Sequence, residues 1–159
     1  MNATAESEDL RIFRDSARRF FERECVPHVE RWEREGIVDR EIWNKAGAAG
    51  LPCAMIPDEY GGAGGSFAHE KILIEEQIRA GVGGWGNAVH SGIVAPYLLH
   101  YGSEEQKKKW LPKLASGELV AAIAMTEPGT GSDLQAVKAT AKLDGNQYVI
   151  NGQKTFITN

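Results

Sequence analysis

The stretch VAAIAMTEPGTGSD, residues Val120–Asp133, marks the change of pattern that decides the fold. The chain carries no charge from Leu119 to Met125, and its small and apolar residues there predict a buried strand. It then passes abruptly into hydroxyl-bearing residues and glycines. Helical patterns precede this point and strand patterns follow it. We therefore predict an all-α domain over residues 1–118 and the incomplete beginning of a β-domain over residues 119–159.

The first of these domains carries helix N-cap residues at intervals. Ser7, Asp39 and Ser66 stand just before apolar residues at helical spacing, and Ser103 with Gln106 forms a capping box. Tryptophans are expected as core or interface anchors. The predicted core positions are Phe13, Ala17, Phe20, Phe21, Trp32, Ile42, Trp43, Ala46, Phe67, Leu73, Ile74, Ile78, Trp85 and Trp110. These signals together predict a helical bundle.

After residue 118 the hydrophobic period changes from about four to two. We predict strands over residues 119–125, 136–143, 147–150 and 154–158, with Asp144-Gly145 as a hairpin turn. A few strands with unpaired edges make a poor independent domain, so we expect the chain to be the front part of a longer protein.

Composition excludes several classes of protein. The chain has 159 residues, 25% of them charged, and a formal net charge of −4, which disfavours a nucleic-acid surface. The basic run Lys107–Lys109 lacks interleaved aromatics and is interpreted as a solvated helix face. Cys25 and Cys53 are far apart and predict reduced thiols in a cytoplasmic compartment. The acidic start predicts no secretory or transit signal, and no apolar run reaches membrane-spanning length.

The loop after the first predicted strand offers neutral hydrogen-bond donors. Thr126, Thr130 and Ser132 supply hydroxyls, and Gly129 and Gly131 leave the backbone approachable, so the loop could hold a phosphate or the polar edge of a ring. The spacing is that of neither a P-loop nor a dinucleotide-binding turn. On composition alone, an ordinary surface loop is favoured.

Other candidates for chemistry favour structural roles. The glycine run at residues 61–65 follows no convincing strand and is interpreted as a connector. The histidines have no metal-ligand spacing, so we predict no metal site. Glu75 and Glu76 are neighbours on a predicted helix and point about 100° apart. We expect both on a solvated face rather than as a catalytic pair.

Four ordered stretches resemble the acyl-CoA dehydrogenase family. Residues 124–133, AMTEPGTGSD, resemble its flavin-site motif, and residues 151–159, NGQKTFITN, resemble its second flavin-contacting strand. IPDEYGGAGG is similar to the loop after its early helices, and YGSEEQKKKWLPKLASGE to the helix before its first strand. HSGIV at His90–Val94, taken with the flavin motif, is most similar to the long-chain-type branch.

The resemblance implies an FAD-dependent oxidoreductase that converts acyl-CoA thioesters to enoyl-CoA in fatty-acid β-oxidation or branched-chain acyl oxidation. It implies a truncated α+β flavoprotein, with a helical bundle followed by the first strands of an antiparallel barrel-like β-domain. Electron-transferring flavoprotein is the implied electron acceptor, and a homotetramer the implied assembly. The catalytic glutamate of the family lies in a later helical domain. No residue of this chain is therefore assigned as catalytic, and the fragment alone is expected to be inactive.

The resemblance also assigns residues to the flavin. The implied cofactor-binding residues are Met125, Thr126, Gly131, Ser132, Phe156, Ile157 and Thr158, and Ser132 also lies where the CoA portion of the substrate passes. Thr126 and Thr158 are expected side by side, and residues 88–94 are expected along the acyl chain. Many members have Trp where this chain has Phe156, which keeps a flat apolar wall but loses an N–H donor. Two alternatives remain: an acyl-CoA oxidase, and a non-catalytic helical interaction module.

Overall fold

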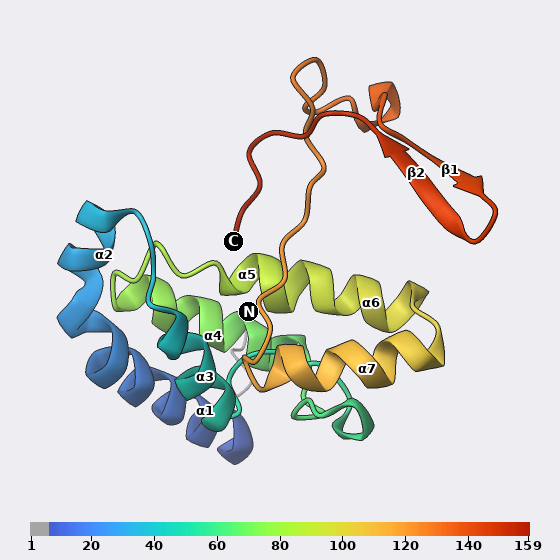
Figure 1. Cartoon of the computed structure of the whole chain (residues 1–159). Coiled ribbons are helices and arrows are strands. Elements are labelled where there is room, and N and C mark those ends of the chain that lie inside the picture. The colour runs from blue at the N-terminus through green and yellow to red at the C-terminus, as the bar shows by residue number, and fades with distance from the viewer. Residues whose placement is uncertain (1–6) are drawn as a thin grey trace, which may run out of the picture. The chain divides into compact units, whose positions relative to one another are not determined.

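Residues 7–159 are described by a computed structural model, and they divide into two compact units between Ala121 and Ala122. Residues 1–6 belong to the start that we interpreted as free of a targeting signal, and they lie outside the described residues. The first unit is helical, and the second contains a short antiparallel hairpin (Figure 1). The predicted class, a helical bundle followed by the first strands of an antiparallel sheet, is confirmed.

Capping residues and apolar spacing set the helices of the first unit. The Ser7 hydroxyl accepts from the Leu10 amide at 3.4 Å, and Ser103 and Gln106 form the predicted capping box. The α-helices are α1 (Glu8–Phe20), α2 (Val29–Glu35), α3 (Arg40–Ala48), α4 (Phe67–Arg79), α5 (Asn87–Val89), α6 (Ala95–Tyr101) and α7 (Glu104–Ala115). Two π-helical turns, Phe21–Cys25 and His90–Val94, extend α1 and join α5 to α6. Short 3₁₀ turns lie at Val26–His28, Asp58–Tyr60 and Leu134–Ala136.

Asp39 precedes α3 but does not cap it through its side chain. Its carboxylate instead pairs with the guanidinium of Arg31 on α2, with one Nη1–Oδ1 distance of 3.0 Å. The Arg31 hydrogen bonds hold the pKa of Asp39 below its usual range. The prediction that the Asp39 side chain caps α3 was therefore wrong. The charged guanidinium of Arg31 is a stronger donor than the backbone amides at the start of the helix.

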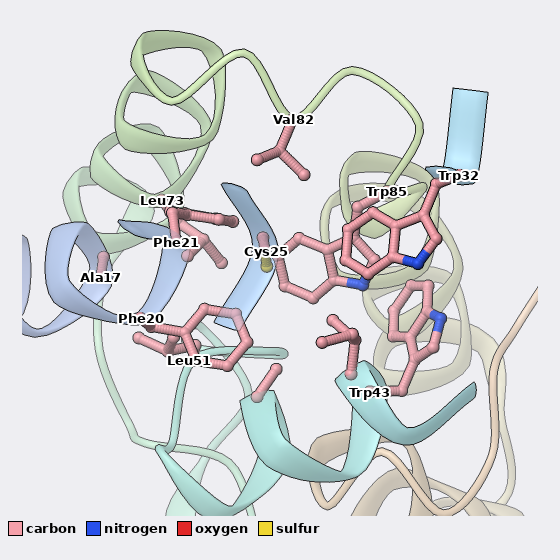
Figure 2. Close-up of a cluster of buried hydrophobic side chains, with 12 residues drawn as sticks. Ala17, Phe20, Phe21, Cys25, Trp32, Trp43, Leu51, Leu73, Val82 and Trp85 are labelled. Carbon is pink, nitrogen blue, oxygen red and sulfur yellow. The ribbon is translucent and has the colours of Figure 1, made fainter. Parts of the chain in front are cut away.

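Aromatic rings fill the core between α1, α3 and α4 (Figure 2). The ring centroids of Trp43 and Trp85 lie 5.2 Å apart, and those of Phe21 and Trp85 lie 5.6 Å apart. Two predicted core residues on α4 are wrong: Phe67 is 69% exposed and Ile78 is 72% exposed. Trp110, also a predicted anchor, is 39% exposed. Helix α4 packs along α1, and its buried residues are Glu70, Ile72, Leu73 and Glu76.

The backbones of α3 and of the turn after α7 pack in direct contact. A Cβ placed on Gly117 would lie 2.0 Å from the carbonyl oxygen of Trp43, and one on Gly47 would lie 2.0 Å from that of Ser116. Gly117 also has a φ of +72°, in the left-handed region that favours glycine. Two glycines therefore permit the close approach of these helices.

The second unit carries β1 (Thr140–Asp144) and β2 (Gln147–Asn151), paired antiparallel from Thr140 opposite Asn151 to Asp144 opposite Gln147. Gly145, with a φ of +61°, supplies the left-handed residue of the predicted hairpin turn. The strands expected over residues 119–125 and 154–158 are wrong. Those stretches form a single isolated β-bridge, between Ile123 and Thr158, and have no further strand to pair with among residues 7–159. None of the described helices combines the length and the apolar character that a membrane span requires.

Candidate functional site

Two segments that are distant in the sequence lie side by side in the second unit. Ile123 and Thr158 form an antiparallel bridge, and the amide of Thr155 donates to the carbonyl of Thr126 at 3.0 Å. The expected neighbourhood of the Thr126 and Thr158 segments is therefore present. Backbone pairing holds it, together with the Lys154 side chain, which donates to the Met125 carbonyl at 3.0 Å.

A tight turn closes the loop that follows Thr126. The amide of Glu127 donates to the carbonyl of Thr130 at 2.9 Å, and the amide of Thr130 donates back to Glu127 at 3.0 Å. Pro128 and Gly129 form the tip of this turn. The Thr130 hydroxyl donates to the carbonyl of Ala136 at 3.1 Å, so its proton serves the loop itself and is not free for a ligand.

The carboxylate of Glu127 joins three stretches of this unit. It accepts from the amides of Lys138 at 2.8 Å and Ala139 at 2.9 Å, and from the ammonium of Lys154 at 3.0 Å. Its side chain is 6% exposed. These hydrogen bonds lower the pKa of Glu127 to about 2, so the carboxylate is ionised at neutral pH. Glu127 is thus a structural residue of the loop.

The residues assigned by resemblance to the flavin divide into apolar side chains and neutral donors. Met125 is 42% exposed, Ile157 52% and Phe156 88%, although all three are large and apolar. Phe156 has a φ of +54°, unusual for a residue with a side chain. These three apolar side chains are open to solvent, so an apolar group could cover them.

Apart from Thr130, the hydroxyl donors of this loop and of Thr158 have no hydrogen-bond partner among the described residues. Within residues 7–159, the hydroxyls of Thr126, Ser132 and Thr158 make no hydrogen bond, and a Cβ on Gly129 or Gly131 would meet no atom within 4 Å. Backbone and hydroxyl donors are therefore available to phosphate oxygens or to the polar edge of a ring.

A buried polar cluster in the first unit was missed from the sequence. Glu70 is 2% exposed, its Oε1 lies 3.5 Å from Nδ2 of Asn87, and its Oε2 has no partner among the described residues. Asn87 accepts from the Ser91 hydroxyl at 2.7 Å, and Ser91 accepts from the Cys53 amide at 2.9 Å. Burial raises the pKa of Glu70 to about 7. Glu70 stands three residues before the core residue Leu73, so helical spacing could have placed it on the buried face.

Glu76 is also buried, and the prediction of a solvated face is wrong for it. It accepts from Nε of Arg18 at 3.0 Å and from Nη1 of Arg14 at 3.0 Å, at 2% exposure. Hydrogen bonds from Arg18 and then Arg14 hold its pKa below the usual range despite burial. Glu75, the adjacent residue, is 41% exposed. The two carboxylates differ in burial but share Arg14, whose Nη1 lies 2.9 Å from Oε2 of Glu75. Both are engaged in ion pairs.

His90 is a fully buried histidine with a partner for each ring nitrogen. Its Nδ1 accepts from the Ala121 amide at 3.0 Å, which leaves Nε2 to donate to the Leu114 carbonyl at 3.1 Å. Burial lowers its pKa, so the ring is neutral. No group of potential metal ligands occurs in the described part of the chain. Cys25 and Cys53 are buried free thiols.

The chain matches two family models in succession. Residues 7–118 match the acyl-CoA dehydrogenase N-terminal domain, and residues 122–159 match the middle domain. The long-chain specific acyl-CoA dehydrogenase of Sus scrofa is 49% identical over 148 residues, 93% of this chain and 34% of that protein. The chain therefore spans about a third of the length of this curated relative.

Solved structures agree with these matches. The crystal structure of acyl-CoA dehydrogenase from Geobacillus kaustophilus has a TM-score of 0.93 at 46% identity, covering 98% of this chain and 41% of that one. The acyl-CoA dehydrogenase complexed with FAD from Bacillus anthracis has a TM-score of 0.87 at 37% identity, covering 100% of this chain and 28% of that one. On the matched domains, their order and these similarities, the chain belongs to the acyl-CoA dehydrogenase family.

Proposed function

We propose that the whole protein is an FAD-dependent acyl-CoA dehydrogenase that oxidises acyl-CoA thioesters to enoyl-CoA, and that residues 1–159 supply one wall of its flavin site. The observation that carries the proposal is the pairing of the Thr126 and Thr155 backbones beside the exposed side chains of Met125, Phe156 and Ile157. This arrangement brings exposed apolar side chains and neutral donors together on two paired segments. Both features suit a cofactor with an apolar ring system and a pyrophosphate.

The residues present fit FAD. Hydroxyls of Thr126 and Thr158 without partners in the described chain would bind the polar edge of the ring, and Met125, Phe156 and Ile157 would exclude water from it. The backbone at Gly131 and the Ser132 hydroxyl would hold the pyrophosphate, with Ser132 also beside the CoA portion of the substrate. FAD, when bound, supplies the acceptor for the hydride that leaves the β-carbon.

The groups that would complete the reaction belong to the rest of the protein. The base that removes the proton next to the thioester carbonyl is proposed outside residues 1–159, as the family resemblance implies, and Glu127 is not proposed for this role. Glu127 is fully engaged by two backbone amides and by Lys154. Electron-transferring flavoprotein as acceptor, a homotetrameric assembly and a cytoplasmic location are parts of the same proposal. A long-chain substrate is favoured by the 49% identity to the Sus scrofa long-chain enzyme.

The test is reduction of the flavin in the full-length protein under anaerobic conditions. A yellow protein whose visible flavin band bleaches on addition of palmitoyl-CoA, and less readily with isovaleryl-CoA, is the expected result. Rapid oxygen consumption during turnover would identify an acyl-CoA oxidase instead. A colourless protein that takes up no added FAD would contradict the proposal and favour the non-catalytic interaction module.

A further inference from the structure

The ammonium of Lys154 lies against the peptide group that joins Met125 to Thr126. Its Nζ is 3.0 Å from the carbonyl oxygen of Met125 and 3.0 Å from Oε1 of Glu127. Its side chain is 25% exposed, whereas that of Glu127 is 6% exposed and is fixed by two backbone amides. Glu127 therefore holds the cation in a defined position on one particular carbonyl.

The opposite side of this peptide group is free. The amide of Thr126 donates to no acceptor within residues 7–159. In a planar trans peptide the N–H points away from the carbonyl, so the Thr126 N–H points away from Lys154. A cation beside the carbonyl oxygen draws electron density from the peptide nitrogen, so the N–H becomes a stronger donor. Consecutive hydrogen bonds polarise one another in the same way.

We propose that Lys154, held by Glu127, is a positioning residue that polarises the Met125–Thr126 peptide and so strengthens the Thr126 amide as a donor to the flavin. This inference rests on the proposed function, in which Thr126 lies at the polar edge of the ring. A stronger donor favours the more electron-rich, reduced form of the ring over the oxidised form. Lys154 thereby raises the affinity of the cofactor for electrons without touching it.

The two members of the ion pair have opposite electrostatic effects on this amide. Lys154→Met removes the cation while keeping an unbranched side chain, so the amide donor weakens. Glu127→Gln keeps an oxygen acceptor for Lys154 but removes the negative charge that partly cancels the cation, so the field of the cation at the peptide grows. If the ion pair only holds the loop in place, both changes should shift the flavin potential in the same direction, because each loosens the same loop.

The experiment measures the two-electron midpoint potential of the flavin in the full-length, FAD-loaded protein by spectroelectrochemical titration. For Lys154→Met we expect the reduced flavin to lose about tenfold in binding relative to the oxidised flavin, a shift of about 30 mV to more negative potential. Lys154→Arg should shift it by much less, and Glu127→Gln should shift it to more positive potential. The FAD dissociation constant of each variant is measured in parallel.

Shifts of the same sign in Lys154→Met and Glu127→Gln, or an unchanged potential in Lys154→Met, would overturn the inference. Loss of FAD from both variants would also overturn the inference, because it would show that the ion pair only holds the loop in place and does not polarise the peptide. The proposed function is tested separately, on the unaltered protein. It is wrong if that protein binds no FAD or if acyl-CoA does not reduce its flavin.

Discussion

The amide nitrogen of Thr155 lies 3.0 Å from the carbonyl oxygen of Thr126, although the two residues are separated by the whole β1–β2 hairpin. With the bridge between Ile123 and Thr158, this bond brings together the two segments assigned to the flavin. Each bond is made by backbone atoms. Side-chain bonds from Lys154 to Met125 and Glu127 link the same two segments. The bond between Thr126 and Thr155 itself does not depend on either side chain, but it requires the Thr155 amide hydrogen.

Thr155→Pro removes that amide hydrogen and leaves the Thr126 carbonyl unpaired. One hydrogen bond contributes about 1 kcal/mol, and the freed segments must also be ordered again on binding, so we expect FAD affinity to fall about tenfold or more. Titration of the full-length apoprotein with FAD, followed by flavin fluorescence, measures the change. Thr155→Ala keeps the amide and is the matched control. Equal affinities for the two variants would show that this bond does not shape the site.

Glu70 makes stability depend on pH in an unusual direction. Burial raises its pKa from an ordinary 4.5 to about 7, so between these values the folded protein binds more protons than the unfolded one. Stability from this group is therefore complete below pH 4.5 and is lost as the pH rises to about 7, by about 3 kcal/mol. Glu70→Gln does not ionise and should be more stable than the unaltered protein at pH 8 but not at pH 4.5. Urea unfolding followed by tryptophan fluorescence at both pH values measures this. A constant difference between the two proteins would contradict the raised pKa.

The elements that local chemistry specifies were predictable, and those that depend on distant partners were not. Ser103 and Gln106 define a capping box within four residues, and Gly145 defines a hairpin turn, so both followed from the sequence. The strand expected over residues 119–125 depends on neighbouring strands, and its only β-bridge among the described residues is the one to Thr158. At the candidate site, hydroxyls and glycines marked the loop, but the contacts of Lys154 depend on a partner 29 residues away, which no spacing rule provides.

Gly117 should be among the least replaceable residues of the helical unit. Gly117→Ala places a Cβ 2.0 Å from the Trp43 carbonyl oxygen and forces a side chain into a φ of +72°. The left-handed backbone costs about 1–2 kcal/mol, and relief of the clash must move α3 away from the end of α7, so we expect a loss of more than about 3 kcal/mol. Thermal unfolding followed by circular dichroism measures it. Gly83→Ala is the control, because its Cβ meets no atom within 4 Å and its φ is not positive. Similar midpoints for the two variants would mean that the close approach is not required.

Glu76 and Glu75 provide a matched pair of neighbouring carboxylates in different environments. Glu76→Ala leaves the guanidiniums of Arg14 and Arg18 without their buried acceptor, and we expect a loss of about 3 kcal/mol. Glu75→Ala removes a partner of Arg14 that is 41% exposed, for which solvent screening limits the loss to about 0.5 kcal/mol. The free energy of unfolding of each variant, from urea titration at pH 7, measures the difference. Because Arg14 contacts both carboxylates, the double variant should lose less than the sum of the two single losses if Glu75 serves mainly to orient Arg14 toward Glu76. Equal losses from the two single variants would instead mean that burial of Glu76 adds nothing to the strength of its ion pairs.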